Sequence, residues 1–411
     1  MSPLLGLITF TFYFFAAISI WLGLVSLRGG MRFGRYLKSE LAKQYPQFTP
    51  FATIFVPCRG VDRGLKENIR AIFAQHYPNF EVIFVADRSD DASIAIIEEA
   101  RREFAGSTPT MRIVISGPAS DCGQKVHNLR TAVIEADSQS EIFVFVDTDA
   151  RPTANWLRSL VGPLQDTSLG ATTGYRWFVP IHGGLASHLC SVWNAAIASA
   201  LGESLEKNFC WGGSTAIRRD TFSRHRVIDY WRGTVSDDFA LTRALHEGGQ
   251  LIKFVPQCLT ASFEDCSFTK LIEFTTRQLK ITRSYAPHLW RGVLIGSLLF
   301  VFVFFGGIAL VIARAFLGQT FAAPLVLLLI ILALGSIKSY SRLRAVSRVV
   351  SDRHIHSVAT TLAHVTLWPL ASLVYLYNSL AAAVSRRIIW RGITYELKSP
   401  TETVILSRES T

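Results

Sequence analysis

The sequence predicts an α/β domain with a mostly parallel sheet, joined to transmembrane helices. Three observations predict this class. Apolar segments long enough to cross a bilayer stand near both ends of the chain. Between them, short apolar runs alternate with helical patterns, which is typical of a parallel sheet with helices on both faces. Hydrophobic residues make up 49% of the 411 residues, and the mean hydropathy of +0.29 is high for a purely soluble protein.

The charge of the chain favours a membrane partner over a nucleic acid. The net charge is +11, with 42 Lys and Arg against 31 Asp and Glu. The basic residues cluster beside the apolar segments, where they would meet an anionic leaflet. Nucleic-acid binding would instead place them among exposed aromatic residues on one face. The six cysteines form no C-x-x-C pair, so we expect scattered reduced thiols.

Residues 1–27 are predicted to be an N-terminal transmembrane anchor. Residues 4–27 carry no charge, and no cleavage pattern of a signal peptide follows them. The juxtamembrane linker 28–49 opens with basic residues, which the positive-inside rule places in the cytoplasm. They are Arg28, Arg32, Arg35 and Lys38.

Residues 50–287 are predicted to form the cytosolic α/β domain. Its strands are followed by Pro, Asp or Gly, and helical patterns alternate with them. Strands are expected at 52–56, 81–86, 111–116 and 142–146, and helices at 68–75, 92–103 and 125–136. The last of these strands is the continuous apolar run from Ile142 to Val146. Such a run is typical of a strand that is buried on both faces of the sheet.

Residues 288–385 are predicted to be a second membrane region, with spans at 292–313 and 315–337. Basic residues follow these spans, which again indicates the cytoplasmic side. The apolar stretch 358–385 is interrupted by Trp368-Pro369. Because proline breaks a helix and the tail 386–411 is basic, we expect this stretch to re-enter or lie at the interface, with a cytoplasmic tail.

Two carboxylates follow the predicted strand 142–146. Asp147 and Asp149 stand one residue apart, at the sheet edge where α/β proteins bind ligands. Paired oxygen ligands there suit a hard divalent cation, Mg or Mn, that also holds a diphosphate. The alternative is an Asp-rich turn with no ligand.

The motifs of the domain resemble those of a known family. They are similar to family 2-type glycosyltransferases of the GT-A fold, the nucleotide-diphospho-sugar transferase fold, and most of all to the ceramide glucosyltransferases of family 21. The matching segments are Gly60-Val-Asp62, Tyr77-Pro-Asn-Phe-Glu81, Asp87–Asp91, Trp211-Gly-Gly-Ser214, Ser236-Asp-Asp238 and Trp390-Arg-Gly392. The layout of one anchor, a cytosolic domain and a C-terminal membrane region also resembles that family.

The resemblance implies a role for each matching carboxylate. Asp87 corresponds to the residue that recognises the uracil and ribose of a UDP-sugar. Asp147 and Asp149 correspond to the D-x-D pair that binds a divalent metal and the diphosphate. Asp238 corresponds to the general base. A metal would neutralise the leaving group, and a separate carboxylate would deprotonate the acceptor, so the reaction is expected to invert the anomeric centre.

One motif departs from the family pattern. Where the family carries (Q/R)-x-x-R-W, this chain has Arg277, Lys280 and Ile281. Arg277 and Lys280 are expected to bind the UDP-sugar, although lysine lacks the bidentate geometry of arginine. Ile281 stands where the family has tryptophan, so the aromatic ring that would contact a sugar or a lipid head group is missing. This motif therefore does not identify the acceptor. The alternative is an amphipathic helix whose cations contact lipid head groups.

Further acceptor-side candidates come from two loops. The resemblance places Trp211, Gly212 and Gly213 against the acceptor, and glycines permit a close approach of the backbone. An ordinary tight turn is the alternative. His182 lies in Pro180-Ile-His-Gly-Gly184 and would contact the sugar or the acceptor, unless it is a bystander.

These features together predict an integral membrane protein of the cell inner membrane or its equivalent, with a cytoplasmic catalytic domain. Its expected activity is transfer of a hexose such as glucose from a UDP-sugar to a lipid hydroxyl such as that of ceramide. A processive polysaccharide synthase is one alternative, but it would need the intact Trp-ending motif and more spans. A catalytically dead scaffold that binds nucleotide is another.

Overall fold

The computed structural model describes residues 3–43, 45, 47–104, 109–350 and 352–408, and the chain divides into two compact units. We call them the helical unit and the sheet unit. The helical unit comprises Met1–Lys38, Pro180–Ser199 and Asp265–Ser385. The sheet unit comprises Ser39–Val179, Ala200–Glu264 and Arg386–Thr411. This division differs from the sequence boundaries, because 180–199 and 265–287 belong to the helical unit and the C-terminal tail belongs to the sheet unit.

A seven-stranded sheet forms the centre of the sheet unit, in the order β3-β2-β1-β4-β6-β5-β7. Its strands are β1 Ala52–Pro57, β2 Phe80–Ala86, β3 Thr110–Ile115, β4 Ile142–Phe145, β5 Leu169–Phe178, β6 Thr215–Arg218 and β7 Leu251–Ser262. The first four strands are parallel, as predicted. Strand β6 is antiparallel to both neighbours and lies between β4 and β5. The predicted mostly parallel sheet is therefore confirmed.

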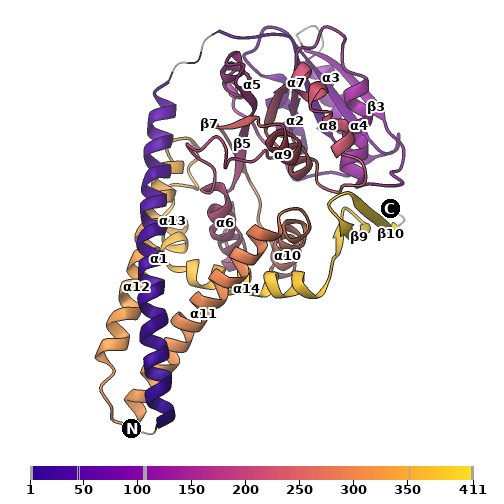
Figure 1. The fold of residues 1–411 in the computed structure, drawn as a ribbon. Helices are drawn as coiled ribbons and strands as arrows, with labels where there is room; N and C mark the ends of the chain where they lie inside the picture. The colour runs from indigo at the N-terminus through magenta and orange to yellow at the C-terminus, as the bar shows by residue number, and fades with distance from the viewer. Residues whose placement is uncertain (1–2, 44, 46, 105–108, 351, 409–411) are drawn as a thin grey trace. The chain divides into compact units, whose positions relative to one another are not determined.

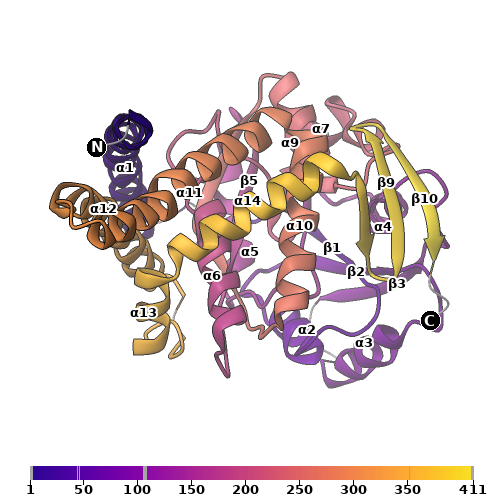
Figure 2. The same cartoon turned by 90° about the horizontal axis from the view of Figure 1, so that it is seen from below.

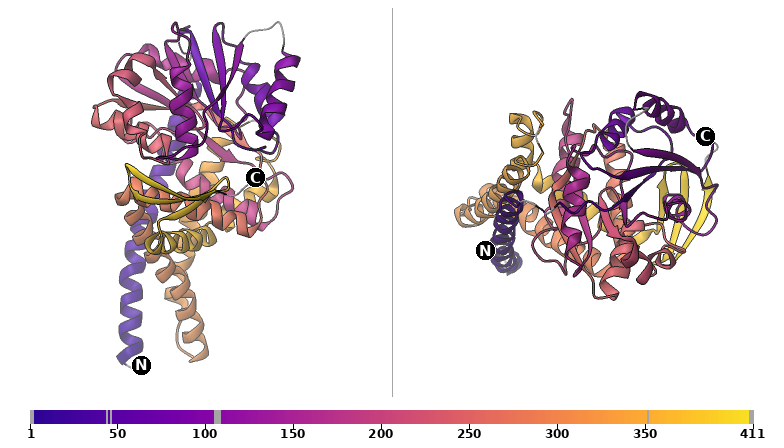
Figure 3. Two further views of the ribbon diagram at one scale, coloured as in Figure 1. Left: turned by 90° about the vertical axis from the view of Figure 1, so that its right-hand side faces the viewer. Right: turned by 90° about the horizontal axis from the view of Figure 1, so that it is seen from above.

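Helices cover both faces of this sheet (Figure 3). Strands β1, β2 and β4 alternate their apolar side chains between two buried clusters, so each face carries its own core. One core packs beneath α2 Leu65–Phe73, α3 Ala92–Glu103 and α5 Trp156–Val161. The other packs beneath α4 Gln124–Ile134, α7 Arg219–Arg224, α8 Val227–Tyr230 and α9 Asp237–Glu247. A short 3₁₀ helix, Gly162–Gln165, follows α5.

The C-terminal tail folds into a second, three-stranded antiparallel sheet (Figure 2). Its strands are β8 Arg387–Trp390, β9 Ile393–Ser399 and β10 Glu402–Arg408. Ile393, Tyr395 and Leu397 are buried while the residues between them are not. The tail is fixed to α4, because the backbone N–H of Gln124 donates to the Tyr395 hydroxyl at 3.1 Å.

The helical unit is built from seven helices among the described residues, three of them long and apolar enough to cross a membrane. The three are α1 Pro3–Leu41, α11 Pro287–Phe316 and α12 Ala322–Val346. Phe12 of α1 packs with Val303 and Leu328 in one apolar cluster, and a Cβ at Gly307 would overlap the Phe12 ring. Figure 1 shows the three helices beside one another. A small residue thus lets membrane helices approach closely.

The remaining helices of this unit are shorter or bent. They are α6 Leu185–Ala198, α10 Phe268–Tyr285, α13 Val358–Thr366 and α14 Trp368–Val384. Helices α13 and α14 meet at Leu367 with a bend of 58°. The break falls beside Trp368-Pro369, where the sequence predicts it, since proline lacks an N–H donor. Helix α14 runs across the direction of α1 and α12 (Figures 1 and 2).

Candidate active site

The two carboxylates after β4 each pair with a half-buried cation. Asp147 Oδ1 lies 2.7 Å from Lys125 Nζ, which comes from the first turn of α4. Asp149 Oδ2 lies 2.9 Å from Nη1 of Arg176, which comes from β5. The guanidinium of Arg176 also lies over the Trp211 ring, 5.3 Å from its centroid. The carboxyl end of β4 is thus a compact cluster of opposite charges.

The surroundings of Asp147 and Asp149 shift the pKa values of the two carboxyl groups in opposite directions. Burial alone would raise the pKa of Asp147, but Lys125 outweighs burial and lowers the pKa. Burial raises the pKa of Asp149, and Arg176 offsets this only in part. In addition, Asp149 Oδ1 is buried and has no hydrogen-bond partner. A buried carboxylate oxygen without a partner is costly, which points to a ligand at this position.

The turn between the two carboxylates is fixed by its central residue. Thr148 Oγ1 donates to Asp62 Oδ2 at 2.5 Å. The side-chain amide of Asn68 donates to the Thr148 carbonyl oxygen at 2.9 Å. Asp62 and Asn68 come from the segment that follows β1. The geometry of the Asp147–Asp149 turn is therefore set by the neighbouring β1–α2 connection.

A third carboxylate joins this cluster from α9. Asp237 Oδ1 lies 3.1 Å from Lys125 Nζ, so Lys125 bridges Asp147 and Asp237. A Cβ at Gly212 would collide with the Asp237 carboxylate and with Lys125 Nζ. Gly213 has no room for a Cβ either, because the Trp211 ring occupies that space. The backbone of this glycine loop lies close to the Lys125–Asp237 pair, and its contact with the acceptor stays a prediction.

The protonation of Asp237 gives the first testable prediction. Burial raises its pKa from the ordinary 3.8 to about 6, against the effect of Lys125. The folded protein therefore holds this proton more tightly than the unfolded chain. The stability that Asp237 contributes is full below pH 3.8 and is lost as the pH rises through about 6. In detergent, the Tm of wild type minus that of Asp237→Asn should fall between about pH 4 and pH 7. A constant difference would contradict this assignment.

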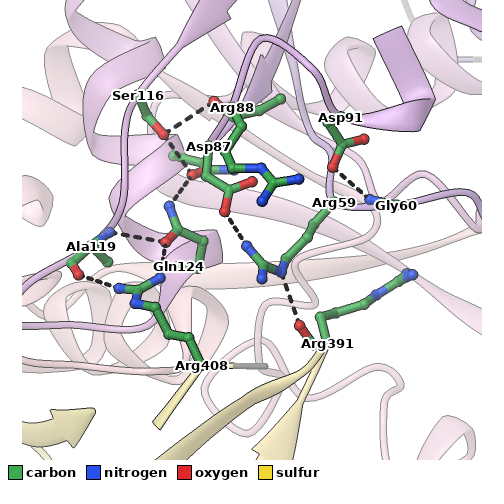
Figure 4. Close-up of polar contacts among 12 residues, drawn as sticks. Arg59, Gly60, Asp87, Arg88, Asp91, Ser116, Ala119, Gln124, Arg391 and Arg408 are labelled. Atoms are coloured by element: carbon green, nitrogen blue, oxygen red, sulfur yellow. Dashed lines mark hydrogen bonds and ion pairs between the residues drawn. The ribbon is translucent and has the colours of Figure 1, made fainter. Parts of the chain in front are cut away.

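Asp87 lies at the end of β2, the strand beyond β1. Its carboxylate is buried and forms an ion pair with Arg59 (Figure 4). Nearby, Asp91 caps α3 by accepting from the Ser93 N–H at 2.9 Å and also accepts from the Gly60 N–H at 2.8 Å. These bonds join the loops after β1 and β2 into one rim.

Asp238 occupies the first turn of α9, next to Asp237. Its Oδ1 accepts a hydrogen bond from the Phe239 N–H at 2.8 Å and another from the Ser236 hydroxyl. Its side chain is half-buried, whereas Asp237 is buried. The two adjacent carboxylates thus differ in access: Asp237 faces Lys125, and Asp238 retains contact with solvent.

The remaining predicted site residues belong to the helical unit. His182 Nδ1 lies 2.8 Å from Asp265 Oδ2, and the imidazole is exposed. Arg277, on α10, lies over the Phe274 ring. Burial lowers the pKa of Lys280, and the Ile281 side chain is buried. The roles of these four residues remain predictions.

Three cations of the sheet unit were missed in the sequence, although each carried a signal. Lys125 lies at a helix N-terminus, where the helix dipole disfavours a cation unless carboxylates face it. Arg176 is the charged residue of an otherwise uncharged strand, which implies a buried partner. Arg391 precedes Gly392 in a tight hairpin turn, at a position that normally holds Asn, Asp or Gly.

The donor set of the Asp147–Asp149 turn fits a divalent cation. Both residues offer hard oxygen ligands, and the buried Asp149 Oδ1 is available to accept a new partner. Within the described part of the chain, no group of three or more His, Cys, Asp or Glu side chains could hold a metal. Protein ligands would therefore be two, and Mg²⁺ commonly takes one or two carboxylates together with substrate phosphates.

The mostly parallel seven-stranded sheet, with carboxylates after β2 and β4, agrees with the GT-A fold that the motifs predict. The family comparison agrees: the model of "Glycosyl transferase family 21" matches residues 11–403. The chain belongs to glycosyltransferase family 21, and the resemblance seen in its motifs is confirmed.

The matches to solved structures are more distant. One is the mannosyltransferase PcManGT from Pyrobaculum calidifontis in complex with GDP-Man and Mn²⁺, at 18% identity and a TM-score of 0.47, covering 90% of this chain and 98% of that one. Another is glucosyl-3-phosphoglycerate synthase from Mycobacterium tuberculosis in complex with phosphoglyceric acid, at 13% identity and a TM-score of 0.36, covering 60% and 81%.

Proposed function

We propose that this protein is a membrane-bound inverting glycosyltransferase that moves a hexose such as glucose from a UDP-sugar to a lipid hydroxyl such as that of ceramide. The observation that carries the proposal is the Asp147–Asp149 turn. Its carboxylates are held by half-buried cations at a strand end, and one buried oxygen of Asp149 has no partner. Family membership supports the reaction class, and the long apolar helices support membrane attachment.

The donor would lie along the ends of β2 and β4. Asp87 is the candidate for the ribose and uracil, and the Asp147–Asp149 turn is the candidate for the diphosphate. Asp147 and Asp149 would hold Mg²⁺ or Mn²⁺, which would neutralise charge that builds up on the leaving diphosphate. Lys125 Nζ lies 2.7 Å from Asp147 Oδ1, so Lys125 would add a positive charge beside the diphosphate.

Asp238 would act on the acceptor. The lipid hydroxyl oxygen attacks the anomeric carbon, its proton passes to the Asp238 carboxylate, and the bond from carbon to the diphosphate oxygen breaks with its electron pair on UDP. Attack from the face opposite the leaving group inverts the configuration. The Phe239 N–H and the Ser236 hydroxyl hold one carboxylate oxygen and leave the other for the acceptor.

The decisive experiment is product analysis with purified membranes. Labelled UDP-glucose, UDP-galactose, UDP-N-acetylglucosamine and GDP-mannose are each incubated with ceramide, with diacylglycerol or without added lipid, and the lipids are analysed by mass spectrometry. A single-hexose glycolipid that forms only with a UDP-sugar supports the proposal. A polymer would indicate a processive synthase, and nucleotide binding without any product would indicate a scaffold.

The membrane topology follows from the folded tail. Residues 386–408 form part of the sheet unit, fixed to α4 through Tyr395, so tail and domain lie on one side of the membrane. The chain from 265 to 385 then crosses an even number of times. Helices α11 and α12 supply two crossings, and the bent pair α13–α14 turns back or lies at the interface. The basic residues that follow α1 favour the cytoplasmic side.

Cysteine labelling tests this topology. After the six native cysteines are replaced, Ser407→Cys and Thr320→Cys place single exposed thiols in β10 and in the loop between α11 and α12. A membrane-impermeant thiol reagent should label Thr320→Cys in intact cells and Ser407→Cys only after permeabilisation. Labelling of both variants in intact cells would contradict this topology and make α13–α14 a crossing. Labelling of Ser407→Cys alone would place the tail and the sheet unit outside.

A further inference from the structure

The turn between β8 and β9 brings one arginine of the C-terminal tail to the carboxylates of the candidate active site. Arg391 Nη2 lies 2.6 Å from Asp62 Oδ1. The other oxygen of the same carboxylate accepts from Thr148, the central residue of the Asp147–Asp149 turn. One carboxylate thus joins the tail to the candidate metal-binding turn, although Arg391 and Thr148 lie far apart in the sequence.

The backbone of the same residue reaches the nucleoside side of the site. Arg59 Nε donates to the Arg391 carbonyl oxygen at 2.9 Å, and Arg59 Nη1 is paired with Asp87. Figure 4 shows Arg59 between Asp87 and the Arg391 carbonyl. Arg391 therefore stands between the residue proposed for the nucleoside and the residues proposed for the metal. In a bound nucleoside diphosphate sugar, the diphosphate joins these two points.

The conformation of Arg391 is unfavourable for an arginine. Its φ is +52°, and φ of Gly392 is +71°. A two-residue hairpin turn with both φ values positive normally carries Asn-Gly or Gly-Gly. A side chain held in such a region despite its cost is a feature that collects at ligand sites. The choice of arginine at this position is thus not explained by the turn itself.

The hairpin is held firmly enough to position this side chain. Tyr395 accepts from the Gln124 N–H, and the Arg408 guanidinium donates to Gln124 Oε1 at 3.1 Å and to the Ala119 carbonyl oxygen (Figure 4). A Cβ at Gly233 would overlap the Thr401 carbonyl. Contacts from β9, from β10 and from the turn between them thus fix the tail to the rest of the sheet unit.

The surrounding carboxylates keep Arg391 charged. Burial alone would lower the pKa of Arg391, but Asp62, Asp149 and Asp147 outweigh burial and raise the pKa. The Arg391 side chain is 40% exposed, so a ligand has access to it. A planar guanidinium with free donors binds phosphate oxygens in a bidentate manner.

We propose that Arg391 is a donor-binding residue whose guanidinium contacts the diphosphate of the nucleotide-sugar, so that the C-terminal hairpin completes the donor site. This inference rests on the proposed function and adds a residue of the tail to it. The pair with Asp62 holds the guanidinium in place before the donor arrives. Both the charge and the turn position then matter for donor affinity.

Arg391→Asn separates this role from a structural one. Asparagine suits the positive φ and removes the charge, so the turn is preserved. Arg226→Asn is the matched control, because Arg226 is the other described non-glycine residue with positive φ, at +50°. It also pairs with an aspartate, Asp229, at 2.7 Å, and it is 77% exposed. Both changes remove an accessible ion pair of small value and relieve a similar backbone strain.

The measurement is the affinity of purified protein for UDP and for uridine, with Mn²⁺ and again with EDTA. Arg391→Asn should weaken UDP binding about tenfold, the usual size of one charge-assisted contact. Uridine affinity should be unchanged, Arg391→Lys should be intermediate, and Arg226→Asn should match wild type in both. The Tm of Arg391→Asn should equal that of Arg226→Asn. In turnover assays, KM for the donor should rise while kcat changes little.

The outcomes distinguish the two proposals. If wild type binds UDP and Arg391→Asn binds it equally well, the role of Arg391 is overturned and the proposed function stands. An equal loss of UDP and uridine affinity, with a lowered Tm, would also overturn it, because that pattern indicates a structural role. If wild type binds GDP but not UDP, the same comparison is made with GDP and guanosine. Arg391→Asn should then weaken the binding of GDP and leave the binding of guanosine unchanged. If wild type binds no nucleoside diphosphate, both proposals fail.

Discussion

Replacing either carboxylate of the D-x-D turn should abolish sugar transfer while the protein still folds and inserts. Asp147→Asn and Asp149→Asn each remove a negative charge from the proposed metal site. We expect a loss of about 10³-fold in turnover, the scale seen when charge stabilisation of a transition state is removed. The assay is formation of labelled glycolipid in membranes, with expression and detergent-extracted Tm measured alongside.

The surroundings of each carboxylate explain why the fold should survive. In Asp147→Asn, Lys125 keeps its partner Asp237 at 3.1 Å. In Asp149→Asn, Arg176 keeps its positions over the rings of Phe178 and Trp211, each 5.3 Å from the ring centroid. Asp220→Asn, at an exposed position of α7, is the matched control and should be fully active. Full activity of Asp147→Asn or Asp149→Asn in EDTA-treated membranes would refute the metal site.

The second large effect is expected at Asp238. Asp238→Asn should lose about 10²–10⁴-fold in turnover, the usual contribution of a general base. Donor affinity should not change, because the base acts on the acceptor hydroxyl. Asparagine still accepts hydrogen bonds from Ser236 and the Phe239 N–H, so the turn is kept. Steady-state rates and the Kd for UDP measure the two effects separately.

Asp237, which precedes Asp238 in the sequence, provides the control for which of the two residues is the general base. Asp237→Asn leaves Lys125 with Asp147 alone, so it should weaken donor binding as well as turnover. The two variants therefore differ in the Kd for UDP. If Asp237→Asn is inactive with normal UDP affinity and Asp238→Asn is active, the general base is Asp237, whose pKa of about 6 would suit that role.

The parallel half of the fold could be predicted because local signals and tertiary structure agree there. The helix expected at 92–103 is α3, since Asp91 caps it through the Ser93 N–H. The strands differ from prediction by one residue at their ends. The D-x-D turn was also evident, because a buried strand ends immediately before it.

The rest of the site depends on contacts between distant parts of the chain. The antiparallel insertion of β6 between β4 and β5 leaves no local signal. Nor does the sequence show that Lys125 bridges Asp147 and Asp237. The three-stranded tail did carry a signal, the alternation of Ile393, Tyr395 and Leu397 with polar residues, but its short strands gain stability only by packing on the sheet unit.

This sheet follows the apolar helices α1, α11 and α12 in the sequence, which has a consequence for biogenesis. The ribosome makes residues 386–408 after these three helices. Until then the nascent chain carries Asp87 and the D-x-D turn but lacks Arg391. On the role proposed for Arg391, a partly translated chain binds donor poorly. Donor binding would thus reach full strength only after the membrane helices have been made, and a chain truncated after Ser385 would lack the contact proposed for Arg391.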